Sequence, residues 1–173
     1  SKPFYSEDGQ TKNVDMMHQK SSFNYNENQT MQIVELPYGN QAFSMIVLLP
    51  KEGNKLADVT QELQNSNSWG NLVSGLRSTQ VDLYLPKFKT EYSRVLNDVL
   101  EKMGMGIAFE PGAADFSRMT DADAFISFVE QFTYINTDEV GTEAAAVTVV
   151  GIELTSYQPD RTATFNANRP FIY

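Results

Sequence analysis

The spacing of the hydrophobic positions changes several times along the chain, and each spacing predicts a different element. Two apolar, β-leaning runs at 30–36 and 42–49 flank Pro37-Tyr38-Gly39-Asn40, whose proline and glycine suit a tight reversal. We therefore expect a hairpin of buried strands there. Between residues 56 and 76 the spacing becomes helical, with a break near 65–68, which predicts two short helices.

The second half of the chain shows both spacings again. Apolar and polar side chains alternate over 81–85, which predicts a strand that ends at Pro86. The i, i+4 spacing over 95–103 predicts an amphipathic helix, with Gly104 as its C-terminal stop. An aromatic, β-leaning run at 125–135 predicts another strand. In total we expect about six or seven strands and three short helices, an α+β pattern without the βαβα alternation of a parallel sheet.

Composition and charge exclude several classes of function. With 22 acidic and 13 basic side chains in 173 residues, the surface repels a phosphate backbone and lacks the polybasic face that binds anionic membranes. We therefore expect neither a nucleic acid nor a membrane as a partner. The absence of cysteine excludes disulfides and thiolate chemistry. Residues 1–9 lack the features of a signal peptide, so we expect any export signal to lie upstream or not to exist.

The chain offers little catalytic chemistry. His18 is the one histidine, which excludes a multi-histidine metal site. As a general base it would need an identifiable nucleophile, and the sequence indicates none, so we build no Ser-His-Asp triad and expect a packed or surface role for it. Pairs of carboxylates occur in turn-like stretches, namely Glu7-Asp8, Asp121/Asp123 and Asp138-Glu139. Asn28-Gln29-Thr30 matches the glycosylation acceptor pattern, which often arises by chance. We expect no catalytic residue, no metal ion and no cofactor.

The segment 139–156 does not fit an ordinary domain. Read with a period of two, one of its faces carries no charge and consists of Thr142, Ala144, Ala146, Thr148, Val150, Ile152 and Leu154. This strand pattern extends for about 43 Å, more than twice the usual strand length. Small, uncharged side chains suit a strand that slips between neighbours that are already packed. The alternatives are a long edge strand and an alanine-rich helical turn that leads into a strand.

Residues 139–146 resemble the hinge of the reactive-centre loop of inhibitory serpins, in which an acidic residue, any residue, Gly, Thr or Ser, and any residue precede several small residues. Further landmarks agree with this family in order and spacing: NVDMM at 13–17, VELPYG at 34–39, MIVLLP at 45–50, LPKF at 85–88, ADFS at 114–117 and FNANRPF at 165–171. Two positions depart from the family pattern. Asp15 replaces a usual proline, and Gln131 replaces a usual histidine of the shutter region.

The resemblance implies that residues 1–173 are the C-terminal portion of a single serpin domain, with the hinge and reactive-centre loop at about 139–160. The fold would be α+β, with mixed, mainly antiparallel sheets and a few short helices. The activity implied is suicide inhibition of serine or cysteine endopeptidases, in which a metastable fold inserts its cut loop into a sheet as a new strand. The hinge would comprise Glu139, Gly141, Thr142, Glu143, Ala144, Ala145 and Ala146.

The family's usual interval from Gly141 implies a reactive bond between Thr155 and Ser156, with Leu154-Thr155 as the alternative. Neither lysine nor arginine precedes this bond, so an elastase-like, subtilisin-like or papain-like protease is expected as the target. The N-terminal half of the same fold is the other expected partner, and the family resemblance implies an extracellular or cell-envelope location. Two other functions stay open: a non-inhibitory, serpin-like binding or chaperone protein, and a small α+β hydrolase that uses Asp121 and Asp123.

Overall fold

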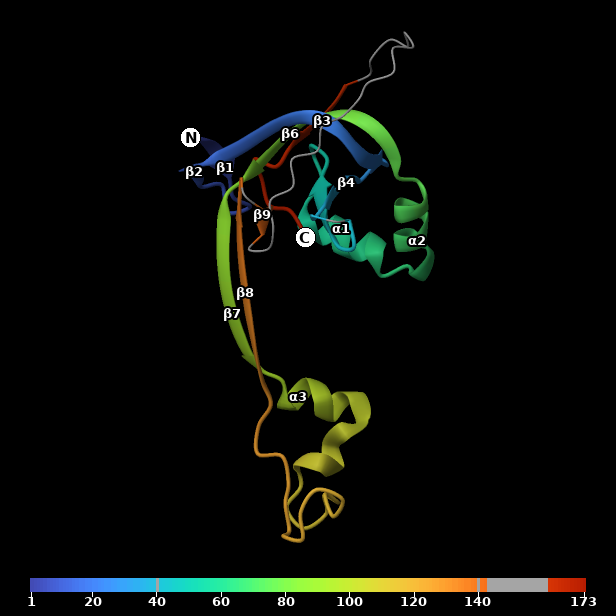
Figure 1. Cartoon of the computed structure of the whole chain (residues 1–173), viewed down its shortest axis with the longest axis vertical. Helices are drawn as coiled ribbons and strands as arrows, with labels where there is room; N and C mark the ends of the chain where they lie inside the picture. The colour runs from blue at the N-terminus through green and yellow to red at the C-terminus, as the bar shows by residue number, and fades with distance from the viewer. Residues whose placement is uncertain (40, 140, 143–161) are drawn as a thin grey trace. The chain divides into compact units, whose positions relative to one another are not determined.

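The computed structural model describes residues 1–39, 41–139, 141–142 and 162–173. These residues form two compact units, Ser1–Phe88 with Asn136–Tyr173, and Lys89–Ile135. Along the described chain the elements follow in the order β1 (Lys2–Tyr5), β2 (Thr11–Val14), β3 (Met16–Glu27), β4 (Met31–Pro37), β5 (Ser44–Pro50), α1 (Leu56–Leu63), α2 (Ser66–Ser74), β6 (Arg77–Pro86), β7 (Phe88–Val95), α3 (Asn97–Leu100), a π-helical turn (Glu101–Met105), a 3-10 turn (Gly106–Phe109), β8 (Glu130–Asp138), β9 (Gly141–Thr142) and β10 (Ala163–Asn166) (Figure 1).

The first unit is built on a five-stranded sheet in the order β10-β6-β3-β4-β5. Strand β10 is parallel to β6, and the other neighbouring strands are antiparallel. The ladder between β3 and β6 extends from Met16 opposite Pro86 to Tyr25 opposite Arg77, and the two strands lie side by side in Figure 1. Strands β1 and β2 form a separate hairpin, and β7, β8 and β9 form a third sheet in that order.

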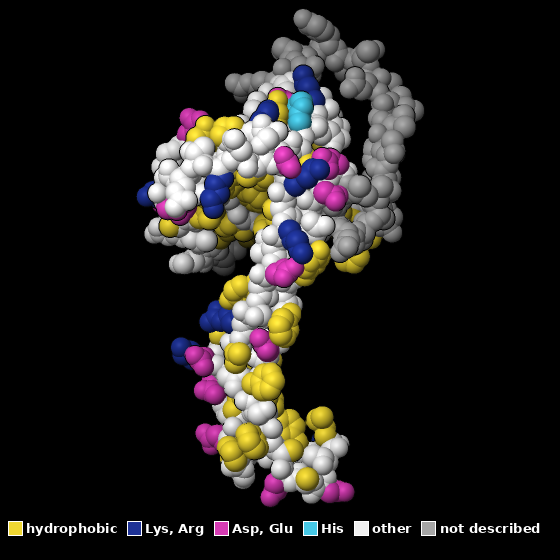
Figure 2. Space-filling model, turned by 90° about the vertical axis from the view of Figure 1, so that its left-hand side faces the viewer, with side chains coloured by type: hydrophobic (Ala, Val, Ile, Leu, Met, Phe, Trp, Pro, Cys, Tyr) yellow, Lys and Arg dark blue, Asp and Glu magenta, His cyan; other side chains and the backbone are white. Residues whose placement is uncertain are grey.

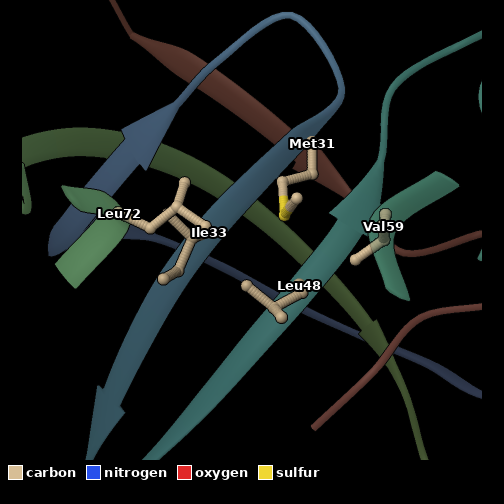
Figure 3. Packing of buried hydrophobic residues seen from close by; sticks show 5 residues of the cluster. All are labelled: Met31, Ile33, Leu48, Val59 and Leu72. Atoms are coloured by element: carbon tan, nitrogen blue, oxygen red, sulfur yellow. The ribbon is translucent and has the colours of Figure 1, made fainter. Parts of the chain in front are cut away.

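The core of the first unit lies between its sheet and the helices α1 and α2. Its buried members converge from two strands and both helices, and they are Met31, Ile33, Leu48, Val59 and Leu72 (Figure 3). Fully burying a side chain of this size contributes about 1.5–3 kcal/mol. The apolar stripes of the two helices are therefore used to cover β4 and β5.

The C-terminal residues are bound to the edge strand β5. Leu48 and Ile172 exchange backbone hydrogen bonds of 2.8 and 2.9 Å, and the guanidinium of Arg169 donates two hydrogen bonds to the carbonyl oxygen of Pro50, at 2.8 and 2.6 Å. Burial lowers the pKa of Arg169. These contacts connect the FNANRPF landmark to the end of the MIVLLP landmark, so the two motifs meet in space.

The second unit, Lys89–Ile135, has no buried residue, although all of its residues are described. Large apolar side chains stay open to solvent on this unit, as Figure 2 shows, and the most exposed are Met119 (82%), Phe132 (76%), Met103 (74%) and Ile107 (64%). Because burial of apolar surface is the dominant favourable term in folding, a unit without a core has little to stabilise it. It needs additional apolar contacts.

Several predicted elements are confirmed. The hairpin is β4–β5, the helical stretch forms α1 and α2 with Asn65 as the N-cap of α2, and the strand that ends at Pro86 is β6. The helix after residue 95 is α3 and the π-helical turn, and Gly104 interrupts it with a φ of 99°, the left-handed conformation that glycine adopts most easily. The α+β class with short helices and mainly antiparallel sheets is also confirmed.

Other predictions need correction. The strand predicted at 125–135 starts later and ends later, as β8 at Glu130–Asp138. The expected tally was too low, because the described residues alone contain the strands β1 to β10. Strands β1, β2, β3, β7 and β10 were not predicted. Strands β1, β2 and β10 have only four residues each, too few to show an alternation, and β3 and β7 consist mainly of polar residues and so lack the apolar alternation of a half-buried strand.

Candidate functional site

The hinge begins as the second strand of a hairpin. Strand β8 ends at Asp138, and β9 folds back on it antiparallel, with Asp138 opposite Gly141 and Thr137 opposite Thr142. Glu139 lies in the turn between them. Thr137 is buried, at 6% exposure, so Thr142 pairs with a buried residue of the first unit. Of the predicted site residues, the structure brings Glu139, Gly141 and Thr142 together at one turn.

The remaining predicted site residues lie outside the part of the chain that the structure describes. They are the hinge residues Glu143, Ala144, Ala145 and Ala146 and the residues of both candidate reactive bonds, Leu154, Thr155 and Ser156. Their assignment therefore stays a prediction.

An ion pair holds the turn at Glu139. The ammonium of Lys87 lies 2.6 Å from the Glu139 carboxylate, and the two side chains are 41% and 60% exposed. This hydrogen bond raises the pKa of Lys87 and lowers the pKa of Glu139. An ion pair this exposed contributes little to global stability, because water screens it. Its effect is local: it connects the turn at Glu139 to Lys87, the residue that follows β6.

Strand pairing positions Lys87 for this contact. Pro86 ends β6 opposite Met16 of β3, and the backbone N–H of Lys87 continues the ladder by donating to the carbonyl oxygen of Asp15 at 2.7 Å. The backbone of Lys87 is thus fixed one residue beyond the longest pairing of the sheet. Sequence reasoning did not select this residue for the site, although it lies in the LPKF landmark, directly after a strand-ending proline.

The edge of β8 beyond the hinge is open within the described structure. Strand β9 pairs only with the last two residues of β8, and the positions from Glu130 to Asn136 have no described strand on that side. Gln131 lies in this stretch and is exposed. Unpaired backbone N–H and C=O groups along a strand edge are a template for another strand.

A groove of about 720 Å³ in the first unit runs beside the approach to the hinge. Residues of β3, β4, β5 and β6 line it together with Thr137, Asp138 and Glu139. Among its lining residues, Glu35 accepts hydrogen bonds from Asn24 (2.8 Å) and from the Ser44 hydroxyl (2.7 Å), and these bonds lower the pKa of the Glu35 carboxyl. The Glu35 carboxylate is thus already bound by two neighbouring side chains.

His18 has a structural role, as expected. Its Nε2 lies 2.6 Å from Asp82 Oδ1, and its ring stacks on Tyr84 at 4.3 Å, while the ammonium of Lys2 lies over that tyrosine ring at 3.9 Å. The hydrogen bond with His18 lowers the pKa of Asp82. These contacts join β1, β3 and β6, so the imidazole is occupied in holding strands together.

The other candidate groups also have structural roles or stand alone. Asn28 of the acceptor pattern binds the turn between β3 and β4, where its side-chain oxygen accepts from the N–H groups of Thr30 and Met31, and its amide donates to Glu62 of α1 at 2.6 Å. Asp121 and Asp123 are exposed. Within the described residues, no cluster of histidine, aspartate or glutamate could hold a metal ion, and no helix is long and apolar enough to cross a membrane.

Comparisons with known proteins match the whole chain to one family. The sequence model described as Serpin (serine protease inhibitor) matches residues 1–173. The leukocyte elastase inhibitor of Equus caballus is 36% identical over 180 residues, which cover 99% of this chain and 47% of that protein. An uncharacterized serpin-like protein of Methanosarcina mazei is 36% identical over 173 residues, which cover 98% of this chain and 40% of that protein.

Solved structures agree with the sequence comparisons. Tengpin, a thermophilic serpin in its native state, superposes on the chain with a TM-score of 0.77 and 32% identity, over 98% of this chain and 44% of that one. The chain spans less than half the length of these relatives, with shares of 40%, 47% and 44%. The match over residues 1–173, the fold and the landmarks agree, and the chain belongs to the serpin family.

Proposed function

We propose that the protein is a suicide inhibitor of serine or cysteine endopeptidases, in which cleavage of the loop after the hinge lets residues from Gly141 onward insert along β8 as a new strand. The observation that carries this proposal is the β8–β9 hairpin, because it already pairs the first hinge residues with β8 in the antiparallel register that an inserted strand needs. The family is that of serine protease inhibitors, which supports an inhibitor rather than an enzyme.

The register of the hairpin assigns a partner to each residue of the proposed strand. If the inserted strand kept the register of Thr142 opposite Thr137, Ala144 would lie opposite Ile135 and Ala146 opposite Thr133. Opposing residues of an antiparallel pair share a face, so the uncharged positions would fall on the face of the buried Thr137. Glu143 would lie opposite Asn136 on the other face. The uncharged positions of the hinge would thus lie on the same face as the buried Thr137, where a charge would be costly.

Strand insertion supplies the energy for inhibition. A new strand gains roughly ten backbone hydrogen bonds at about 0.5–1.5 kcal/mol net each, enough to drive a large rearrangement. Inhibition then depends on a race between insertion and hydrolysis of the acyl-enzyme. The small residues Gly141 and Ala144 to Ala146 favour insertion because they meet few steric barriers, and none of them is catalytic.

The proposed reactive bond is Thr155-Ser156, or Leu154-Thr155 one residue earlier. Neither bond follows a basic residue, and Arg161 lies well beyond them, so the target class is elastase-like, subtilisin-like or papain-like. The horse relative is a leukocyte elastase inhibitor by name, which supports the first of these classes. We further assign residues 1–173 to the C-terminal portion of one domain, with the N-terminal half as its partner and an extracellular or cell-envelope location, as the family resemblance implies.

Incubating the complete serpin domain with pancreatic elastase should give an SDS-stable complex, whereas trypsin should give none. Mass spectrometry of the released peptide should place the cut at Thr155-Ser156 or at Leu154-Thr155. Cleavage only after Arg161 would refute the proposed register of the loop. Cleavage by elastase, subtilisin and papain without any stable complex, and without a rise in thermal stability, would instead favour the non-inhibitory binding or chaperone protein.

A further inference from the structure

Lys87 has a second carboxylate neighbour at the hinge turn. Because Met16 lies opposite Pro86 in an antiparallel ladder, Asp15 is the cross-strand partner of Lys87, and the 2.7 Å hydrogen bond from Lys87 N to Asp15 O confirms the pairing. Directly opposed side chains of such a pair share a face, with their Cβ atoms about 4.5–5.5 Å apart. The Asp15 side chain is exposed. It therefore lies within reach of the Lys87 ammonium.

The charges around Lys87 agree with this geometry. Its pKa is raised first by the hydrogen bond to Glu139, and then by the negative charges of Glu139, Asp15 and Asp138, in that order. An ammonium has three donors, and the Lys87 side chain has a flexible four-carbon stem, so it can turn from one carboxylate to another without moving the backbone.

We propose that Asp15 is an alternative partner of Lys87, which receives its ammonium when the Lys87–Glu139 ion pair opens and thereby makes the hinge turn easier to release. The inference rests on the proposed function only in one respect, namely that release of the turn would precede insertion of the cut loop. Asp15 acts through Lys87 and is a positioning residue. Without Asp15, an opened turn leaves the Lys87 ammonium with one fewer carboxylate, so opening costs more and the closed turn is more populated.

Hydrogen exchange at the amides of Gly141 and Thr142, measured by NMR on the complete domain, tests this inference directly. Asp15→Asn should slow the exchange of these amides by about two- to fivefold, the range expected for an exposed ion pair. Asp15→Glu should restore the original rate, because it returns the carboxylate. Asp98→Asn, which removes one charge from an exposed residue of α3, should leave the rate unchanged.

The double variant Asp15→Asn/Glu139→Gln separates this role from a structural one. If Asp15 acts by competing for Lys87, adding Asp15→Asn to Glu139→Gln should change the exchange rate by less than about 1.5-fold, because no ion pair is left to compete with. Unchanged or faster exchange in Asp15→Asn would overturn the inference, and so would slowing that persists without Glu139. Exchange rates do not depend on inhibition, so failure to inhibit any protease would count against the proposed function alone.

Discussion

Replacing Thr142 by arginine should convert the protein from an inhibitor into a substrate, raising the amount needed to inactivate one equivalent of protease at least about tenfold. Position 142 pairs with Thr137, which is only 6% exposed, so an inserted strand would carry the guanidinium on the buried face. Burying an unpaired charge costs several kcal/mol, and each 1.4 kcal/mol or so slows a step about tenfold. If insertion is slower, the acyl-enzyme is hydrolysed first, and the protease is released active.

The matched comparison is Glu143→Arg, which adds the same side chain one residue later, on the face that already carries a charge. Its loss of inhibition should be much smaller than that of Thr142→Arg. Both variants are titrated against elastase, and residual activity and SDS-stable complex are measured together. Equal stoichiometries for Thr142→Arg and the unmodified protein would contradict the proposed face of the inserted strand.

The isolated chain of 173 residues should not behave as a stable monomer. Its second unit has no buried residue, and side chains such as Phe132 (76% exposed) and Met119 (82% exposed) are left open. Beyond β9, no described strand covers the edge of β8. Exposed apolar patches and unpaired strand edges favour association. We therefore expect self-association, or a loose second unit, unless the N-terminal half of the domain covers these surfaces.

Sedimentation and thermal unfolding of the isolated chain, each compared with the complete domain, measure this effect. We expect a range of large species and no single cooperative transition for the isolated chain, and a monodisperse monomer for the complete domain. Mixing the chain with a separately produced N-terminal half should restore one cooperative transition. A monodisperse, cooperatively unfolding monomer of the isolated chain would show that it is self-sufficient, and the proposal that it is half of one domain would then fail.

Local patterns predicted the elements whose residues carry their own signal. The β4–β5 hairpin has two apolar runs around a Pro-Gly turn, and α1 and α2 have helical stripes that the core uses directly. Strand β3 was missed because most of its residues are polar and show no apolar alternation, so its strand conformation comes from the long pairing with β6 rather than from its own pattern. Strand β8 was misplaced by several residues, since its aromatic run is exposed on the described structure and marks no buried face.

By itself, the sequence determined the family resemblance, the composition of the hinge and its uncharged alternate positions, because these depend only on residue types and their spacing. The tertiary structure alone decided that Thr142 lies opposite Thr137, that this position is buried, and that Lys87 holds the turn at Glu139. Asp15, Lys87 and Glu139 are far apart in the sequence and meet only through sheet register and the β8–β9 turn. Periodicity reports which face a residue occupies within one strand, whereas register between distant strands is set by the packing of the whole fold.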